Sequence, residues 1–311
     1  MPEAPKPSNA APNAEQPISG QLAKRLLGKC TFPSAGTSVV IGVSGGPDSL
    51  ALLVLAAEAG LKVTAVHVDH GLRPDSANEA ERVREAAQRF GAQFRAEAVQ
   101  VEPGSNLEER ARLARHQALG PDAMTGHTAD DQAETLVVNL MRGAGPRGLA
   151  SIEAGYRHPI LGLRRSETVA LCDEFGLEPF VDPTNTDPRF VRNRVRHDVL
   201  PLLNDVSGRD VVPLLVRTAA TARSTVADID VLAAQVDVTD SRALQKLVPS
   251  VAKAALGRWL RDDLGHPPSA AELDRAMAVV NHEIIATELR GGRRLSRTDG
   301  RLIVSGPSRS D

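Results

Sequence analysis

A run of glycines and serines with one aspartate, Ser44-Gly45-Gly46-Pro47-Asp48-Ser49, is the part of this chain best suited to binding a phosphate. Gly45 and Gly46 have no Cβ, so their backbone can approach a ligand closely. Ser44 and Ser49 add hydroxyl groups, and the first amides of a helix that starts here point outward without partners. Such a helix start is a common anion site, and phosphate is its usual ligand.

The same run lacks the lysine of a Walker A loop, G-x-x-x-x-G-K-[ST]. Pro47 suits a first helical turn, and Asp48 stands where a nucleotide kinase needs a cation. A carboxylate beside phosphates suggests a bridging Mg²⁺. These residues could instead only cap a helix, but the complete pattern between a buried strand and a buried helix favours phosphate binding. The run resembles the pyrophosphate loop of the N-type ATP pyrophosphatases, which cleave ATP to AMP and pyrophosphate.

Acidic residues at helical spacing occur in the segment 126–135. If a helix begins near Thr128, then Asp130, Asp131 and Glu134 lie along one side of its first two turns. Three carboxylates there suit an acidic pocket for Mg²⁺ or for an ammonium group. An ordinary helix start explains them as well, because acids complement the helix dipole and Thr128 with Asp131 fits a capping box. Both interpretations stay open at this point.

Histidines and a glycine-rich basic segment add further candidates. His127 is expected to orient a phosphate or a base. His67 and His70 have the spacing of metal ligands, but two histidines without further partners more often orient backbone or substrate. The segment 142–149 brackets two arginines with glycines. It suits a loop that closes over a polyanion, and a solvated surface loop has the same composition.

Arg192 and Arg196 lie four apart on a predicted helix. Like charges at this spacing destabilise an isolated helix by about 0.2–0.5 kcal/mol, so we expect an anion against this face. The structural candidates are nearby carboxylates, Asp182, Asp187 and Asp198. The functional candidate is a phosphate or an adenylated base, which an arginine fork can bind in two places.

Strands and helices alternate through the first two thirds of the chain. We predict strands at 39–41, 62–68, 92–101 and 123–125, with helices at 50–57, 76–90 and 106–119 between them. Right-handed crossovers then give a doubly wound, Rossmann-like parallel sheet with helices on both faces. Ligands bind such sheets at the carboxyl ends of the strands, where the glycine turn, Asp69-His70 and Gly126-His127 all fall.

The length of 311 residues allows an α/β domain and a smaller second domain. We predict a disordered tail at 1–17, a catalytic domain at 18–205, a linker helix at 206–235 and a mostly helical domain at 236–311 that ends in an arginine-bearing hairpin. The net charge of −2 restricts any nucleic-acid surface to a local patch. Aromatic residues make up only 3% of the chain, which speaks against RNA binding dominated by stacking.

Cysteine usage and the N-terminus indicate a cytosolic protein. Cys30 and Cys172 form neither a C-x-x-C pair nor a disulfide framework. This also argues against relatives that insert sulfur with paired cysteines or an iron–sulfur cluster. Residues 1–17 lack the apolar core of a signal peptide or membrane anchor, so no membrane partner is expected.

Four segments together resemble the tRNA(Ile)-lysidine synthetase family across roughly residues 38–203. They are the phosphate loop, His67–Arg73, the 126–134 segment with Arg142-Gly143 after it, and Arg192-Asn193-x-x-Arg196. The resemblance implies ATP-dependent ligation of free lysine to the wobble cytidine of a tRNA(Ile). The base is first adenylated on its carbonyl oxygen with loss of pyrophosphate, and the lysine amine then displaces AMP.

On this interpretation we expect Asp48 and Asp131 to bind Mg²⁺, and Asp131 with Glu134 to hold the metal or the lysine ammonium. His127 would orient a phosphate or the base, and Arg196 would stabilise developing charge. The domain 236–311 would position the tRNA. One alternative is a PP-loop amidating ligase for a small carbonyl or carboxylic substrate, which would turn over ATP without RNA. Another is a non-catalytic, ATP-sensing RNA-binding module. The sequence does not decide the oligomeric state, and a homodimer is one arrangement that it allows.

Overall fold

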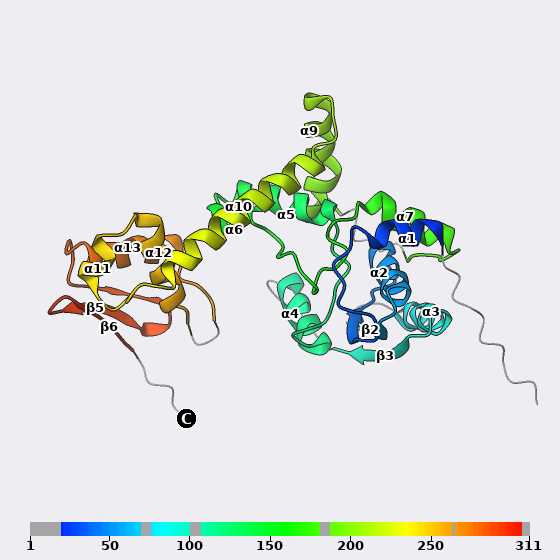
Figure 1. Ribbon diagram of the computed structural model, residues 1–311, viewed down its shortest axis with the longest axis horizontal. Helices are drawn as coiled ribbons and strands as arrows, with labels where there is room; N and C mark the ends of the chain where they lie inside the picture. The colour runs from blue at the N-terminus through cyan, green and yellow to red at the C-terminus, as the bar shows by residue number, and fades with distance from the viewer. Residues whose placement is uncertain (1–19, 70–75, 100–106, 181–186, 263–264, 307–311) are drawn as a thin grey trace, which may run out of the picture. The chain divides into compact units, whose positions relative to one another are not determined.

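The computed structural model describes residues 20–69, 76–99, 107–180, 187–262 and 265–306 (Figure 1). The chain divides into two compact units. Unit 1 contains the chain up to Gly143 together with Ser151–Arg217, and unit 2 contains Ala144–Ala150 together with Thr218–Asp311. The predicted tail at 1–17, His70 and Asp182 lie outside the described residues.

A parallel sheet lies at the centre of unit 1. Its strands β1 (Ser38–Gly42), β2 (Lys62–Asp69) and β3 (Gln93–Ala98) are hydrogen-bonded in the order β1-β2-β3. On the other side of β1, Met124 forms a parallel bridge with Ile41 where the sequence predicts a short strand. The predicted α/β architecture is therefore confirmed.

Helices cover both faces of this sheet. The helices in this part of unit 1 are α1 (Gln21–Leu27), α2 (Pro47–Glu58), α3 (Ser76–Arg89), α4 (Leu107–Leu119), α5 (Ala129–Met141) and α7 (Arg165–Glu174). Successive strand side chains point to opposite faces, so Ile41 and Ala65 enter the core beneath α2 and α3. Val40 and Val66 point the other way and pack against Leu119 of α4. Figure 1 shows α4 on the side of the strands opposite α2 and α3.

The main core of unit 1 also contains both cysteines. Cys172 is buried and Cys30 is half-buried. Burial raises the pKa of each thiol to about 12. Because the thiolate is the reactive form and the metal-binding form, neither side chain is suited to nucleophilic or metal chemistry at neutral pH.

A separate helical segment follows the sheet and packs on α5. It consists of α8 (Val191–Arg194), the π-helical turn η2 (Val195–Val199) and α9 (Leu200–Ser207), which ends at Gly208 in the left-handed conformation. Val195 and Leu200 contact Ala133 and Val137 of α5 in a small apolar cluster. This cluster fixes the arginines at 192 and 196 beside the start of α5.

Unit 2 is built from helices packed on an antiparallel sheet. Its elements are α6 (Pro146–Leu149), most of α10 (Val212–Ala233), α11 (Ser241–Gln245), α12 (Pro249–Trp259), α13 (Ala270–Val280), β4 (Ala286–Glu288), β5 (Arg294–Thr298) and β6 (Arg301–Ser305). Leu256 and Leu260 are fully buried in its core, and Trp259 packs against that core, as predicted. The predicted hairpin is β5–β6, and β4 extends it to three strands.

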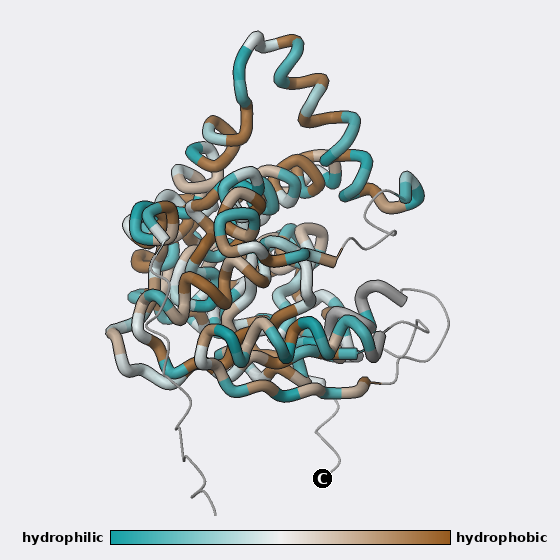
Figure 2. Tube along the Cα trace, turned by 90° about the vertical axis from the view of Figure 1, so that its right-hand side faces the viewer, coloured by the Kyte–Doolittle hydropathy of each residue, from teal (hydrophilic) through white to brown (hydrophobic). Residues whose placement is uncertain are grey.

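Several of the helices carry mixed apolar and polar residues, which appear as alternating brown and teal along the tube in Figure 2. Such patterns are typical of helices with one buried face. None of the helices in the described ranges is long and apolar enough to cross a membrane.

The basic segment 142–149 is not a simple surface loop. Its second half forms α6, and Arg147 donates two hydrogen bonds to Asp230 of α10, at 2.6 and 3.0 Å. Arg223 of α10 donates to the carbonyl oxygen of Ala150 at 2.8 Å. The guanidinium of Arg147 therefore has a structural partner, and closure of this segment over a polyanion stays a prediction.

Candidate active site

The phosphate loop leads from β1 into α2. Gly45 has a φ of +82°, a conformation that residues with a side chain rarely adopt. Gly46 is the N-cap of α2 and Pro47 lies in its first turn. The Ser49 hydroxyl accepts from the Ser44 amide at 3.2 Å and donates to the Gly46 carbonyl at 2.9 Å. The loop is thus held closed by its own serine, and the first amides of α2 have no intrahelical acceptor.

Two neighbouring strand ends support this loop. His67 is buried, and its Nδ1 lies 3.0 Å from the carbonyl oxygen of Val43. His67 therefore orients backbone, which confirms the more common interpretation of its sequence pattern. A Cβ on Gly126 would lie only 2.7 Å from the carbonyl oxygen of Asp48, so the 124–126 segment packs directly on the first turn of α2.

The start of α5 combines a helix cap with a functional face. The backbone amide and the hydroxyl of Thr128 both donate to Asp131 Oδ2 at 2.8 Å, which confirms the capping box. The other oxygen of Asp131, and both oxygens of Glu134, accept hydrogen bonds from arginines. The two interpretations of this segment are therefore compatible, since Asp131 caps with one oxygen and faces the site with the other.

Three arginines surround the acidic pair. Arg196 donates to both oxygens of Glu134, at 2.7 and 3.1 Å. Arg192 donates to Glu134 Oε2 and to Asp131 Oδ1, each at 2.8 Å. The third, Arg165, donates to Glu134 Oε1 and Asp131 Oδ1, each at 3.0 Å. Charge-assisted bonds of this kind are stronger than neutral ones, and the fork fixes their direction.

The anion against the Arg192–Arg196 face is thus the acidic pair of α5. Among the candidates proposed from sequence, Asp187 pairs with Arg189 and Asp198 pairs with Arg194. Sequence proximity suggested those partners, whereas the true ones lie about sixty positions earlier in the chain. The structure brings Asp131, Glu134 and Arg196 together, and their roles in catalysis stay predictions.

Arg165, the first residue of α7, was not identified from sequence. Besides the acidic pair it contacts Asp48 of the phosphate loop, from Nε to Oδ2 at 3.2 Å. One turn later, the Thr168 hydroxyl donates to the other carboxylate oxygen of Asp48. A signal was present, because Arg164 and Arg165 put two cations at a helix start, where anions are normally favoured. Such a pair needs anionic partners.

Asp130 turns away from this cluster. Both of its oxygens accept from the Arg164 guanidinium at 3.1 Å, and Oδ2 also accepts from the backbone amide of Arg165 at 2.8 Å. Arg164 pairs with Asp210 as well. Asp130 therefore anchors the start of α7 to α5, and only Asp131 and Glu134 face the site.

The carboxylates differ in how well the ligand-free protein stabilises their charge. Burial raises the pKa of Asp48, and its contacts with Arg165 and Thr168 offset this only in part. Burial also opposes ionisation of Asp131 and Glu134, but the surrounding arginines hold the pKa of both carboxyls below the usual range. Asp48 is consequently the carboxylate that would gain most from an added cation.

Asp48 and Asp131 have the chemistry that a magnesium site requires. Mg²⁺ prefers hard oxygen ligands and is commonly bound by one or two carboxylates together with substrate phosphates and water. No group of three histidine, cysteine or acidic side chains suited to a metal occurs among the described residues. The phosphates would therefore supply the remaining ligands, and the metal role of these two residues stays a prediction.

His127 belongs to a cluster of two histidines and a threonine. Its Nδ1 lies 2.8 Å from the Thr125 hydroxyl and 3.2 Å from Nδ1 of His158, and the Thr125 hydroxyl is 2.9 Å from the same His158 atom. The two rings are edge to face, with centroids 4.8 Å apart. Because a hydroxyl donates only one hydrogen, the tautomers of the two histidines depend on each other.

A cavity of about 320 Å³ lies beside the phosphate loop, within the size range of small-molecule pockets. Phe180 donates its backbone amide to the Gly45 carbonyl at 2.8 Å and forms part of the wall. The lining combines apolar and charged side chains of α2, α3 and the segment after α7: Leu50, Glu79, Arg82, Val83, Glu85, Ala86, Arg89, Leu177, Glu178 and Phe180.

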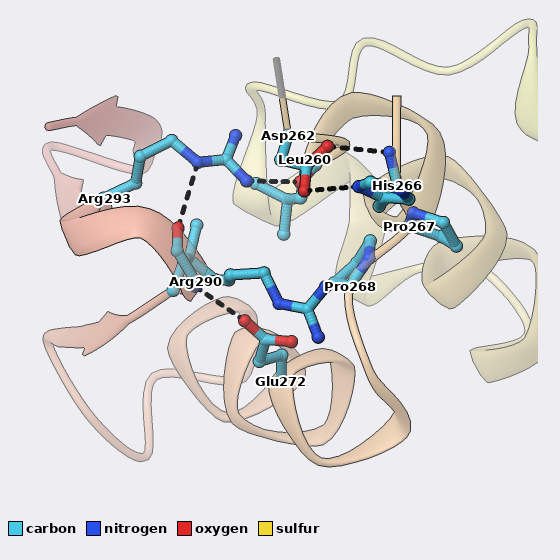
Figure 3. Close-up of a pocket in the computed structure, with 9 residues that line it drawn as sticks. Leu260, Asp262, His266, Pro267, Pro268, Glu272, Arg290 and Arg293 are labelled. Carbon is cyan, nitrogen blue, oxygen red and sulfur yellow. Dashed lines mark hydrogen bonds and ion pairs between the residues drawn. The ribbon is translucent and has the colours of Figure 1, made fainter. Parts of the chain in front are cut away.

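A second cavity, in unit 2, is too small for a nucleotide. Its volume is about 10 Å³, enough for roughly one water molecule. Figure 3 shows how its arginines differ. Arg293 donates to the carbonyl oxygens of Leu260 and Arg261, at 2.9 and 2.8 Å, and so completes the end of α12. The Arg290 guanidinium makes no hydrogen bond or ion pair with the part of the chain that is described, although its backbone amide donates to Glu272 at 2.7 Å and its carbonyl oxygen accepts from Arg293 at 3.4 Å.

Comparison with known proteins agrees with this site. The PP-loop domain family matches residues 19–203. The chain is 40% identical over 287 residues to the tRNA(Ile)-lysidine synthase of Mycobacterium tuberculosis H37Rv, which covers 86% of this chain and 87% of that protein. It is 37% identical over 292 residues to the tRNA(Ile)-lysidine synthase of Nocardia farcinica, with 88% of each chain covered.

Among solved structures, the U34-tRNA thiolase NcsA of Methanococcus maripaludis aligns with a TM-score of 0.49 at 20% identity, over 64% of this chain and 77% of that one. The assignment rests on the sequence matches instead, since one covers residues 19–203 and the others cover 86% and 88% of the chain, which is more than unit 1 alone contains. This chain belongs to the tRNA(Ile)-lysidine synthase family of PP-loop proteins.

Proposed function

We propose that this protein is an ATP-dependent carbon–nitrogen ligase that attaches lysine to the wobble cytidine of tRNA(Ile) and releases AMP and pyrophosphate. One observation carries the proposal. In a chain of the lysidine synthase family, a phosphate loop without a Walker lysine is joined through Arg165 to a buried acidic pair. ATP and an amine substrate therefore have adjacent binding groups.

The first step is attack of the cytidine carbonyl oxygen on the α-phosphorus of ATP. The amides at the start of α2 would bind the phosphates, with Gly45 and Gly46 allowing close approach of the backbone. Mg²⁺, held by Asp48 and Asp131, would neutralise phosphate charge. The protein's own contribution is positioning and fixed electrostatics, which suffice for much of the acceleration in such transfers.

In the second step the lysine amine attacks the activated base and AMP leaves. Asp131 and Glu134 are the proposed anchor for the ammonium group, because they are the most deeply buried carboxylates at the site. Arg196 is proposed to stabilise charge on the phosphate or the base. His127 is proposed to orient one of these groups through its fixed contact with Thr125.

The two alternatives from sequence have less support. An amidating ligase for a small substrate and a non-catalytic RNA-binding module both share the phosphate loop. Neither accounts for identity that runs through unit 2 as well, over 86–88% of the chain.

The test is incubation with tRNA(Ile) carrying a wobble cytidine, together with ATP, Mg²⁺ and lysine. Mass analysis of the wobble nucleoside should show lysidine, and labelled ATP should give AMP and pyrophosphate. ADP as the main product would contradict the pyrophosphatase assignment. AMP formed without tRNA would indicate the amidating ligase, and no turnover at all would indicate the binding module. Asp48→Asn, which keeps the shape of the side chain but removes its charge, serves as the inactive control.

We further propose that the C-terminal part of the chain positions the tRNA, with boundaries near 18–205, 206–235 and 236–311. The linker corresponds to α10, within which the two units divide at Arg217 and Thr218. A cytoplasmic location follows from a tRNA substrate. A homodimer stays a prediction, and the exposed apolar side chains of α9, Leu202 and Val206, support it. Sedimentation of the protein and of Val206→Asp would test this.

A further inference from the structure

Arg165 contacts both the phosphate loop and the acidic pair Asp131 and Glu134. Its three guanidinium nitrogens each donate to a different carboxylate, on Asp48, Asp131 and Glu134. Arg192 and Arg196 pair with Asp131 and Glu134 and have no ion pair with Asp48. Arg165 is thus the direct link between the phosphate loop and the acidic pair.

The acidic pair has no free acceptor position toward this link. Glu134 accepts two hydrogen bonds at each of its oxygens, and Asp131 Oδ1 accepts two more while Oδ2 caps α5. A carboxylate oxygen has about two acceptor sites. An ammonium group can therefore bind Asp131 and Glu134 only where a guanidinium withdraws.

Phosphate binding at the start of α2 provides a reason for Arg165 to move away from the acidic pair. Asp48 lies in the first turn of α2, directly after Gly46 and Pro47, so its partner Arg165 is the cluster arginine next to the anion site. The cluster itself is balanced, with three carboxylates against three guanidinium groups. A bound triphosphate keeps a net negative charge even with one Mg²⁺, so it attracts the nearest guanidinium, which can bind phosphate oxygens with its fork.

We propose that Arg165 is a positioning residue that makes amine binding depend on ATP. Without nucleotide it holds Asp48, Asp131 and Glu134 and blocks the acidic pair. When a triphosphate binds, Arg165 turns toward it and exposes carboxylate oxygens to the amine substrate. This inference rests on the proposed function, because lysine is taken as the amine.

The experiment is equilibrium binding of labelled lysine to the full-length protein, with and without a non-hydrolysable ATP analogue and Mg²⁺. In the wild type we expect lysine to bind at least about tenfold more tightly with the nucleotide, within the usual range of coupling between sites. By reciprocity, lysine must tighten nucleotide binding by the same factor. In Arg165→Gln, which removes the block, lysine should bind more tightly than in the wild type when nucleotide is absent, and the coupling should fall below about threefold.

A gain of lysine binding separates this role from a purely structural one, because a damaged site would lose affinity in both conditions. Arg165→Lys keeps one charge but cannot reach three carboxylates, so an intermediate coupling is expected. Arg194→Gln is the matched control, since Arg194 lies between the two cluster arginines but pairs with Asp198 at the surface. Its coupling should equal that of the wild type.

The inference is overturned if wild-type lysine binding is the same with and without nucleotide, or absent with nucleotide. It is also overturned if Arg165→Gln binds lysine more weakly in both conditions. Either result leaves the proposed function standing when the wild type still forms lysidine and AMP. Loss of those products in the wild type would contradict the function itself.

Discussion

At the scale of single residues, the site shows how one side chain can serve stability and chemistry together. Asp131 caps α5 with one oxygen and binds arginines with the other. Glu134 is only 1% exposed in its side chain and has three arginine partners. A buried charge of this kind is tolerated only when it is fully paired. Its partners are therefore constrained by the fold as well as by the reaction.

Arg196→Lys tests this dual role. Lysine keeps the charge but cannot bind both oxygens of Glu134 as the arginine fork does. We expect the free energy of unfolding to fall by about 1–2 kcal/mol, the order of one lost charged hydrogen bond. Ligase activity should fall far more, and single-turnover AMP formation with thermal melting separates the two effects. Arg194→Lys is the control, and a variant of Arg196 that melts and reacts like the wild type would leave it no special role.

At the scale of elements, helices and strands with a strong local sequence pattern could be predicted. The side-chain contacts between these elements could not. The apolar strands around Ile41 and Ala65 and the leucine- and alanine-rich helix α2 follow directly from local pattern. The capping box at Thr128 is likewise a local signal. The partners of Arg165 and Arg196 come from elements 31 to 117 positions away. Such contacts depend on how helices pack, which no short window of sequence contains.

Gly126 lies at a close contact with the first turn of α2, and the effect of this contact can be measured. A Cβ there would lie 2.7 Å from a backbone oxygen of the first turn of α2. Because backbone cannot yield as a flexible side chain does, Gly126→Ala should cost about 1–3 kcal/mol through overpacking. It should also displace the phosphate loop, which raises the KM for ATP. Gly145→Ala is the matched control, since its φ is −74° and a Cβ there meets nothing within 4 Å. An unchanged KM in Gly126→Ala would show that the loop does not depend on this contact.

The start of α13 carries a pH-dependent cap. The amide and the hydroxyl of Ser269 donate to Glu272, and so does the amide of Arg290, at 2.7–2.8 Å. These bonds hold the pKa of Glu272 below its usual range. The folded-state pKa is depressed, so the stabilisation is present above the unfolded-state pKa of about 4.3 and is lost as pH falls through the folded-state value.

Glu272→Gln should therefore destabilise the protein by about 1 kcal/mol at neutral pH, the typical worth of a cap. The difference from the wild type should be constant above about pH 5.5 and shrink toward pH 3. Denaturant unfolding of both proteins across this range measures it. A difference that does not change with pH would mean that the charge of Glu272 is unimportant.

At the scale of the whole molecule, the net charge is close to neutral. We therefore expect tRNA binding to depend on a small number of arginines whose guanidinium groups are not used within the protein. Arg293 and Arg297 are committed to carbonyl oxygens at helix ends. Within the described ranges, the guanidinium groups of Arg290 and Arg294 form no hydrogen bond or ion pair. We expect the double variant Arg290→Ala with Arg294→Ala to weaken tRNA binding and to reduce the salt slope by about 0.7–0.9 for each lost phosphate contact.

Filter binding at several salt concentrations measures this slope. Arg301→Ala is the control, since Arg301 lies on the same sheet but pairs with Asp237. An unchanged salt slope in the double variant would mean that neither Arg290 nor Arg294 contacts a phosphate of the tRNA. These point variants are preferable to deletion of residues 240–311, because the deletion would strip Leu244 and Leu256 from the core against which Ile229 and Ala233 of α10 pack.

The assignment of α6 to unit 2 also bears on how the protein is made. The ion pair between Arg147 and Asp230 spans 83 positions, and most of the intervening chain belongs to unit 1. Because synthesis runs from the N-terminus, unit 1 leaves the ribosome before the second part of unit 2 does, so the 144–150 segment must wait for its partner. Contacts of such long range slow folding because a large loop has to close first. The nascent chain will thus pass through a state in which the phosphate-binding unit is formed while α6 still lacks its binding surface.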